Sequence, residues 1–133
     1  MTFCAADRHV AFADADIVSQ LIALLLRTGE ERQFEILAYC FMPDHLHLLV
    51  EGLSPGSELL PFCTLLRQRL AHAYARRARR SLWQYGYWER VLRDDETTGA
   101  YVRYVLGNPV RMGLVRAVRD YAFSGGTWMD RMD

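Results

Sequence analysis

The first third of the chain carries apolar residues at helical spacing. Four of them lie at positions i, i+4, i+7 and i+8, which form one face of a helix: Ile17, Leu21, Leu24 and Leu25. Asp14 or Asp16 can accept hydrogen bonds from the first turn, and Gly29 offers a stop. We therefore expect a helix over about residues 15–28.

Strand patterning follows directly after this helix. Residues 34–42 are rich in aromatic and β-forming types, Pro43 and Asp44 interrupt the run, and apolar residues resume over residues 46–50. The pattern predicts a β-hairpin.

The second half of the chain predicts two more helices and a short strand. Residues 58–80 favour a long helix, residues 90–93 favour a strand, and carboxylates at 94–96 favour a helix that runs to about Gly107 and is ended by Asn108 and Pro109. Residues 2–4 and 10–12 can add an amino-terminal strand. The order of elements predicts an α+β fold, in which helices cover a small antiparallel sheet in a ferredoxin-like or RRM-like sandwich.

Composition limits the class of protein. The 133 residues fit one domain over residues 1–133, and 51% hydrophobic and 24% charged residues are typical of a soluble globular chain. No apolar run approaches the roughly 20 residues that span a membrane, and no secretory signal is present, so we expect a cytoplasmic protein with no membrane partner. Cys4, Cys40 and Cys63 are too scattered for a disulfide framework or a CxxC zinc site, which favours buried small side chains.

Charge is unevenly distributed although the formal net charge is zero. No carboxylate occurs from Leu59 to Trp88, whereas six arginines do: Arg67, Arg69, Arg76, Arg77, Arg79 and Arg80. Such a basic segment presents a local positive field that suits a polyanion such as DNA. An ordinary solvated helix face explains the same pattern equally well.

Two histidines are the clearest candidates for chemistry. His45 and His47 are separated by one residue in a predicted strand, so both imidazoles point to one face while Leu46 and Leu48 point to the other. Two adjacent imidazoles can bind one divalent metal and leave open coordination positions, as a catalytic metal requires. The residue pattern alone leaves open that both histidines are simply tolerated on a half-exposed strand.

Three stretches of the chain resemble one family. Residues 39–50, YCFMPDHLHLLV, resemble the MPxHxHLLV signature of the single-tyrosine, His-hydrophobic-His (HUH) transposases, the transposase IS200-like family. Residues 104–115, YVLGNPVRMGLV, are similar to the YxxxNPVRxGLV block of its REP-associated tyrosine transposase branch. Residues 83–95, WQYGYWERVLRDD, are similar to an aromatic stretch of the same family.

The resemblance implies an enzyme of DNA transposition and recombination. It assigns His45 and His47 as ligands of Mg²⁺ or Mn²⁺ and Tyr104 as the nucleophile, with Tyr101 as the alternative. It also suggests Asn108 as a third metal ligand, on the same helix face as Tyr104 if the helix continues that far. Tyr104 would attack a DNA phosphodiester to give a 5'-phosphotyrosine, and the reverse reaction would rejoin the strand.

Single-stranded or hairpin DNA is the expected partner. The basic segment is interleaved with aromatic side chains that can stack on bases or pack in the core: Phe62, Tyr74, Trp83, Tyr85 and Trp88. The sequence leaves open whether the chain forms a homodimer.

Other functions fit the residues too. One is a non-catalytic single-stranded nucleic-acid-binding module on an RRM-like sheet, in which the histidines and the tyrosine are incidental. Another is a metal-dependent phosphodiesterase that uses water instead of tyrosine. A domesticated protein acting on chromosomal repeats would have the same site as a mobile transposase.

Overall fold

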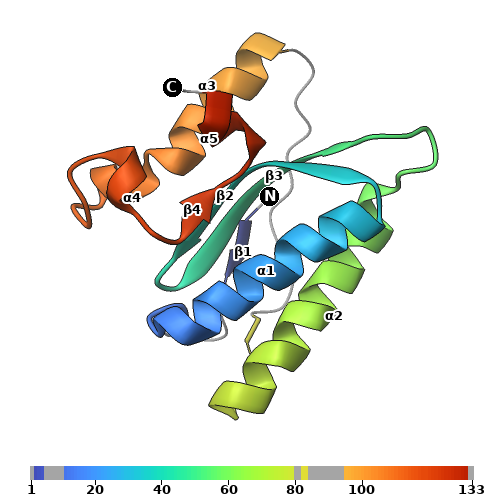
Figure 1. Ribbon diagram of the computed structural model, residues 1–133, viewed down its shortest axis with the longest axis horizontal. Helices are drawn as coiled ribbons and strands as arrows, with labels where there is room; N and C mark the ends of the chain where they lie inside the picture. The colour runs from blue at the N-terminus through green and yellow to red at the C-terminus, as the bar shows by residue number, and fades with distance from the viewer. Residues whose placement is uncertain (1, 5–10, 80–81, 84–94, 132–133) are drawn as a thin grey trace.

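A four-stranded sheet forms the centre of the computed structural model, which describes residues 2–4, 11–79, 82–83 and 95–131 (Figure 1). The strands are β1 (Thr2–Cys4), β2 (Phe34–Met42), β3 (His45–Gly52) and β4 (Ser124–Gly125), in the order β1-β3-β2-β4. Each neighbouring pair is antiparallel, and β2 and β3 form the predicted hairpin. The strand predicted at residues 90–93 lies outside the described residues.

Helices cover both faces of this sheet. The long helices α1 (Ala15–Glu31) and α2 (Leu59–Ala78) pack side by side on one face, and α3 (Asp95–Leu106) and α5 (Thr127–Arg131) pack on the other (Figure 1). The short helix α4 (Asn108–Arg111) and the 3-10 turn η2 (Val118–Asp120) connect α3 to β4. Because β3 lies between β1 and β2, the β1-α1-β2 unit is the split crossover of ferredoxin-like folds. The predicted α+β sandwich is confirmed.

The two faces of the hairpin are set by a β-bulge. Ile36 pairs with Val50 and Ala38 pairs with Leu49, so Leu37 is an extra residue in β2. The bulge shifts the alternation by one: residues 39 and 41 face α1 and α2, whereas residues 38, 40 and 42 face α3. It therefore decides which β2 side chains lie beside the two histidines.

The first helix begins where predicted but ends later. The Asp14 carboxylate accepts hydrogen bonds from the backbone N–H groups of Asp16 and Ile17, at 2.9 and 3.3 Å. Gly29 was expected to stop the helix, yet α1 continues through it to Glu31. A Cβ at Gly29 would lie 2.9 Å from Ile36 Cδ1, so this glycine allows the close approach of α1 to β2. Gln33, with φ of 60°, makes the turn instead.

The expected end of the third predicted helix at about Gly107 is confirmed, but the chain does not leave helical conformation at Asn108 and Pro109. Helix α3 ends at Leu106, and Asn108 begins the separate helix α4. Proline is tolerated in a first helical turn because its missing N–H would have no intrahelical acceptor there. The continuous helix that would place Asn108 on the Tyr104 face is therefore interrupted at Gly107. In the described part of the chain, no helix is long and apolar enough to span a membrane.

Gly126 is expected to be the most sensitive glycine of the fold. Its φ is 118°, and a Cβ there would lie 2.4 Å from the Leu37 carbonyl oxygen at the bulge. Gly126→Ala combines backbone strain with a clash against backbone, so we expect a loss of at least about 3 kcal/mol in the free energy of unfolding. Gly113→Ala is the control, because φ is 75° but nothing lies within 4 Å of the new Cβ. Denaturant unfolding of both variants tests this, and equal losses would contradict it.

Candidate active site

The two histidines lie side by side on the α3 face of the sheet. Their ring centroids are 4.6 Å apart with perpendicular ring planes. Leu46 and Leu48 are fully buried on the other face, against α1 and α2, as the alternation of a strand requires. The predicted common face of His45 and His47 is thus confirmed.

A carboxylate orients one imidazole, and burial sets the charge of the other. His45 Nδ1 lies 2.7 Å from the Asp44 carboxylate, which can only accept, so Nδ1 donates to it and Nε2 points away from Asp44. Burial lowers the pKa of His47 to about 4, and the neighbouring His45 and Arg111 act in the same direction. His47 is therefore neutral near pH 7. A neutral imidazole such as that of His47 is the form that binds metals, and a carboxylate partner such as Asp44 orients a ligand ring.

Tyr104 approaches the pair from helix α3. Its ring centroid is 6.1 Å from that of His47, in an edge-on arrangement. The helix buries Val102, Val105 and Leu106 against the sheet and leaves Tyr104 51% exposed. Tyr101, one turn earlier, is more buried and packs with that core, its ring 6.0 Å from the Tyr104 ring. Tyr104 thus combines proximity to His47 with access to a large substrate.

Asn108 is connected to Tyr104 through an arginine. Arg111 Nη2 donates to the Tyr104 backbone oxygen at 2.6 Å and to Asn108 Oδ1 at 3.3 Å. The same guanidinium lies 4.3 Å from the centre of the Tyr104 ring. Residues from β3, α3 and α4 therefore meet on one side of the sheet.

The comparisons with known proteins bear on this arrangement. The family model described as "Transposase IS200 like" matches residues 1–107. This chain belongs to the IS200-like transposase family.

Two curated members of this transposase family are similar to the chain. A Haemophilus influenzae protein assigned as a REP-associated tyrosine transposase is 26% identical over 120 residues, covering 82% of this chain and 68% of that protein. The REP-associated tyrosine transposase of Escherichia coli is 26% identical over 100 residues, covering 75% and 59%. The chain thus spans about two thirds or less of the length of these relatives.

A solved transposase structure confirms the fold. The structure of a REP-associated tyrosine transposase, described as bound to a REP hairpin, superimposes with a TM-score of 0.77 and 23% sequence identity. The match covers 92% of this chain and 72% of that one. At this level of identity the likeness establishes the fold alone.

The donor atoms of this IS200-like site suit a divalent cation only in part. Among the described residues, no group of three or more histidine, cysteine, aspartate or glutamate side chains could hold a metal ion. His45 and His47 supply two nitrogen donors, and the Asn108 amide oxygen is the third candidate on the same side. A metal held there would need oxygens from substrate or water to complete its coordination.

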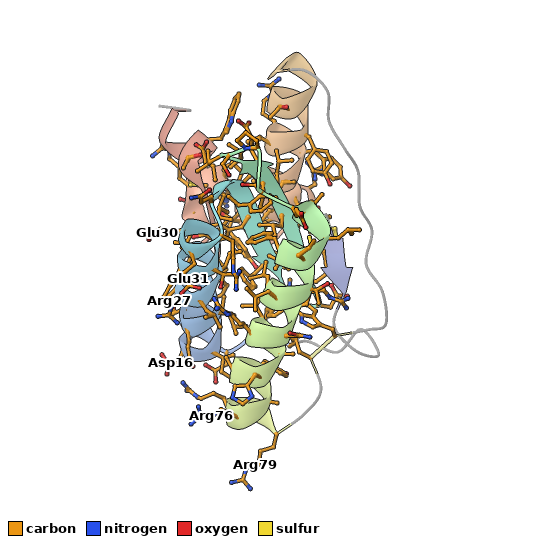
Figure 2. All side chains as sticks on the ribbon, turned by 90° about the vertical axis from the view of Figure 1, so that its right-hand side faces the viewer. Asp16, Arg27, Glu30, Glu31, Arg76 and Arg79 are labelled. Carbon is orange, nitrogen blue, oxygen red and sulfur yellow. The ribbon has the colours of Figure 1, made fainter. Side chains whose placement is uncertain are left out.

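The predicted DNA-binding arginines that the structure describes lie on the opposite side of the sheet from Tyr104, because α2 packs with α1. Arg69 donates to Glu31 at 2.6 Å, and Arg77 donates to Gln20 at 3.2 Å, both across the helix pair. Arg67 is half-buried, its guanidinium 5.8 Å from the Trp83 ring centre. Arg76 and Arg79 project into solvent (Figure 2). Arg80 lies outside the described residues.

The sequence left open whether the aromatic side chains stack on bases or pack in the core, and the described ones pack in the structure. Phe62 and Tyr74 are buried in the α1/α2 core, and Phe62 stacks on Phe34 with ring centroids 4.4 Å apart. Trp83 donates its indole N–H to the Arg67 carbonyl at 2.9 Å. Tyr85 and Trp88 fall outside the described residues. The α2 helix directs its aromatic residues inward because that face meets the sheet.

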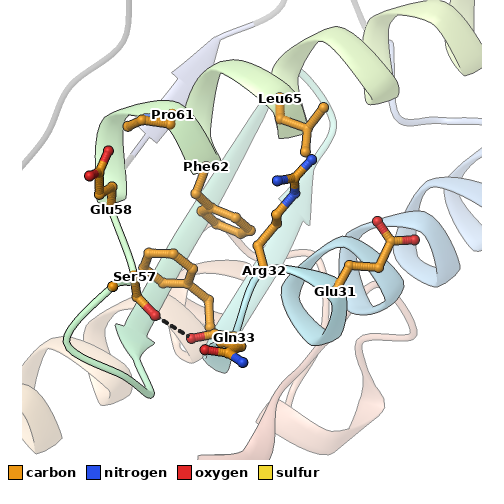
Figure 3. A pocket seen from close by; sticks show the side chains of 10 residues that line it. Glu31, Arg32, Gln33, Ser57, Glu58, Pro61, Phe62 and Leu65 are labelled. Atoms are coloured by element: carbon orange, nitrogen blue, oxygen red, sulfur yellow. Dashed lines mark hydrogen bonds between the residues drawn. The ribbon is translucent and has the colours of Figure 1, made fainter.

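Two hollows border the helix pair, away from Tyr104. The basic groove, of about 760 Å³ between α1 and α2, contains Arg27, Arg69, Arg76, Arg77 and His72, and Glu31 is the only carboxylate that the described residues contribute to it. The other, of about 460 Å³, lies between the end of α1 and the start of α2 and carries both signs, with Arg32, Glu31 and Glu58 (Figure 3). Only the basic groove suits a polyanion.

The protein is expected to lose stability at alkaline pH. Burial raises the pKa of Cys40 from 9.0 to about 12 and that of Tyr121 from 10.0 to about 12. Above pH 9 the folded chain therefore holds protons that the unfolded chain releases, so the free energy of unfolding falls as pH rises toward 12. Each group contributes a slope of up to about 1.4 kcal/mol per pH unit.

Denaturant unfolding between about pH 8 and about pH 11 measures this slope. Cys40→Ala should make it shallower. Leu49→Ala, which alters the same core without a titrating group, should lower stability equally at every pH. An unchanged slope in Cys40→Ala would contradict the assignment.

Two residues of the site were missed by the sequence analysis. Asp44 was interpreted as a strand breaker, although its position beside His45 could have indicated a carboxylate–histidine pair. Arg111 lies within the NPVR block, but its stacking on Tyr104 depends on the break between α3 and α4. No sequence spacing indicates such a contact.

Proposed function

We propose that this chain cuts and rejoins single-stranded DNA by attack of Tyr104 on a phosphodiester. The observation that carries the proposal is the Tyr104 ring, exposed and edge-on to His47 at 6.1 Å, on the face where both imidazoles lie. Family membership supports DNA cleavage and joining as the class of reaction.

The proposed step replaces one phosphodiester bond of the DNA with a bond from phosphorus to Tyr104. The phenol of Tyr104 loses its proton, and its oxygen forms a bond to phosphorus. The bond from phosphorus to the 3'-oxygen breaks, and that oxygen takes up a proton. The products are a 5'-phosphotyrosine and a free 3'-hydroxyl, so attack by a 3'-hydroxyl on the linkage releases the tyrosine and rejoins a strand.

His45 and His47, with Asn108 as the third candidate, would hold Mg²⁺ or Mn²⁺. Such a cation supplies Lewis-acid stabilisation of negative charge on the phosphate oxygens. The chain's own contribution is to orient His45 through its hydrogen bond to Asp44 and to keep His47 neutral through burial. The hairpin of β2 and β3 gives this pair a rigid base.

Hairpin DNA is the proposed substrate class. The similar solved transposase is described as bound to a REP hairpin. The basic groove gives this chain a positive surface away from Tyr104, which can contact the DNA backbone beyond the reacting phosphate.

The test uses a pool of labelled single-stranded hairpin DNAs, incubated with the protein in Mn²⁺ or in chelator. A DNA–protein adduct that survives denaturant and requires Mn²⁺ supports the proposal. Binding without any adduct or nick would favour the non-catalytic module. Nicking without an adduct would favour a phosphodiesterase that uses water.

Charge reversal in the basic groove is expected to weaken DNA binding. Arg27 on α1 and Arg76 on α2 are exposed and line it, so Arg27→Glu/Arg76→Glu should reduce affinity by on the order of 10²-fold or more at low salt. The slope of log K against log salt should become shallower by roughly 2. Two charge reversals elsewhere, Arg103→Glu/Arg116→Glu, have the same effect on net charge and serve as the control. Equal losses in both pairs would indicate a nonspecific charge effect.

A further inference from the structure

Arg111 is the arginine that contacts the candidate nucleophile. Its Nη2 donates to the Tyr104 backbone oxygen and to the Asn108 amide oxygen, and its guanidinium lies 4.3 Å from the Tyr104 ring centre. The two hydrogen bonds and the ring contact together fix the orientation of the guanidinium.

The backbone is shaped to admit this side chain. A Cβ at Gly107 would lie 3.1 Å from Arg111 Nη1 and 2.8 Å from the Arg103 carbonyl oxygen. Glycine at the junction of α3 and α4 therefore leaves room for the guanidinium to fold back over α3. Helix α4 carries Arg111 in its last turn, one turn beyond Asn108.

The described arginines of α2 cannot perform this role. They lie on the other side of the sheet, and Arg69 and Arg77 are bonded to residues of α1. The phosphate attacked by Tyr104 has to lie beside its phenol oxygen, on the α3 side. Among the described residues, a positive group for that phosphate has to come from α3, α4 or the histidine face.

The guanidinium keeps donors for an anion. Arginine has five N–H groups, and the two hydrogen bonds of Arg111 both come from Nη2. The Nε and Nη1 groups remain for phosphate oxygens, and the residue is exposed to solvent. A planar cation already oriented by the protein needs little reorganisation when charge develops on a phosphate.

We propose that Arg111 binds the phosphate that Tyr104 attacks, while the same guanidinium stacks on the Tyr104 ring and holds the Asn108 amide. This inference rests on the proposed function and adds to it the side chain that binds the substrate phosphate. The alternative role is structural: an arginine near the end of α3 that stabilises the helix by bonding a terminal carbonyl.

The kinetic test compares Arg111→Met and Arg111→Lys with Arg103→Met, which removes an exposed charge from the same end of α3. At saturating hairpin DNA, Arg111→Met should slow adduct formation by on the order of 10²-fold or more, and Arg111→Lys by about 10-fold. Arg103→Met should stay within about 3-fold of wild type. Equal rates in Arg111→Met and Arg103→Met would overturn the proposal.

A binding test identifies the phosphate itself, without chemistry. Each linkage of the best-bound hairpin is replaced in turn by a neutral methylphosphonate, and affinity is measured in chelator for Tyr104→Phe and for Tyr104→Phe/Arg111→Met. Replacement of one particular linkage should weaken the binding of Tyr104→Phe by about 10-fold or more and leave the affinity of Tyr104→Phe/Arg111→Met unchanged. A purely structural arginine would give the same loss in both proteins at every linkage, which would overturn the proposal.

The two tests separate the two proposals. We call a linkage coupled when its neutral replacement weakens binding only if Arg111 is present. A coupled linkage at which the wild-type protein also forms its adduct supports both proposals. If a coupled linkage is found but the wild-type protein forms no adduct, Arg111 remains a phosphate-binding residue and the cutting reaction is overturned. An active wild type with no coupled linkage overturns only the role of Arg111.

Discussion

Tyr104→Phe is expected to abolish the covalent DNA adduct, lowering its rate of formation by on the order of 10⁴-fold or more. The substitution removes only the phenol oxygen that would bond to phosphorus. The ring keeps its edge contact with His47 and its stacking with Arg111. The thermal midpoint of unfolding and the affinity for hairpin DNA should therefore match the wild-type values. Denaturing gels measure the adduct, and fluorescence anisotropy measures the affinity.

Tyr101→Phe is the matched control for this prediction. Tyr101 lies on the same helix with its ring 6.0 Å from that of Tyr104, and it packs against the α3 core. The variant should retain the adduct. If Tyr101→Phe lost the adduct and Tyr104→Phe kept it, Tyr101 would be the nucleophile. If Tyr104→Phe still nicked DNA, water would be the attacking group.

His45→Gln and His47→Gln are expected to have the second-largest effect. Each removes one of two imidazoles that lie 4.6 Å apart, and a single remaining nitrogen donor cannot hold a divalent ion well. We expect a loss of about 10²-fold or more in both Mn²⁺ affinity and adduct rate. Manganese binding followed by electron paramagnetic resonance gives the affinity without DNA.

His72→Gln is the control for the histidine pair. His72 is exposed on α2, on the other side of the sheet, so its removal should change neither quantity. Glutamine in place of His47 keeps a polar group at a buried position, and the unfolding midpoint of each variant separates metal loss from misfolding. Wild-type Mn²⁺ affinity in both His45→Gln and His47→Gln would contradict the assignment of the pair.

Local features of the fold were predictable from the sequence. The common face of His45 and His47 follows from the two-residue period of a strand, and the Asp14 cap follows from the chemistry of a first helical turn. The long helices were located to within a few residues because their patterning is local as well. Tyr104 and Asn108 came from the family motif rather than from spacing, and their chemical roles remain predictions.

Features that depend on distant contacts were not predictable. The two-residue strand β4 has no patterning of its own and exists because it pairs with Tyr39 and Cys40 of β2. Gly29 looks like a helix stop in the sequence, but contact with Ile36 gives it a packing role. The sequence predicted a basic segment that suits DNA, but only the packing of α2 on α1 decided that its described arginines lie on the side of the sheet opposite Tyr104.

The sequence by itself determined the elements, the paired imidazoles and the family motifs, because each depends on residues within one or two turns of chain. Tertiary structure decided which side chains meet. The bulge at Leu37 selects the face of β2 beside the histidines, and the break at Gly107 turns Arg111 back onto Tyr104. Such contacts join residues of separate elements, so they are fixed only when the helices and the sheet pack against one another.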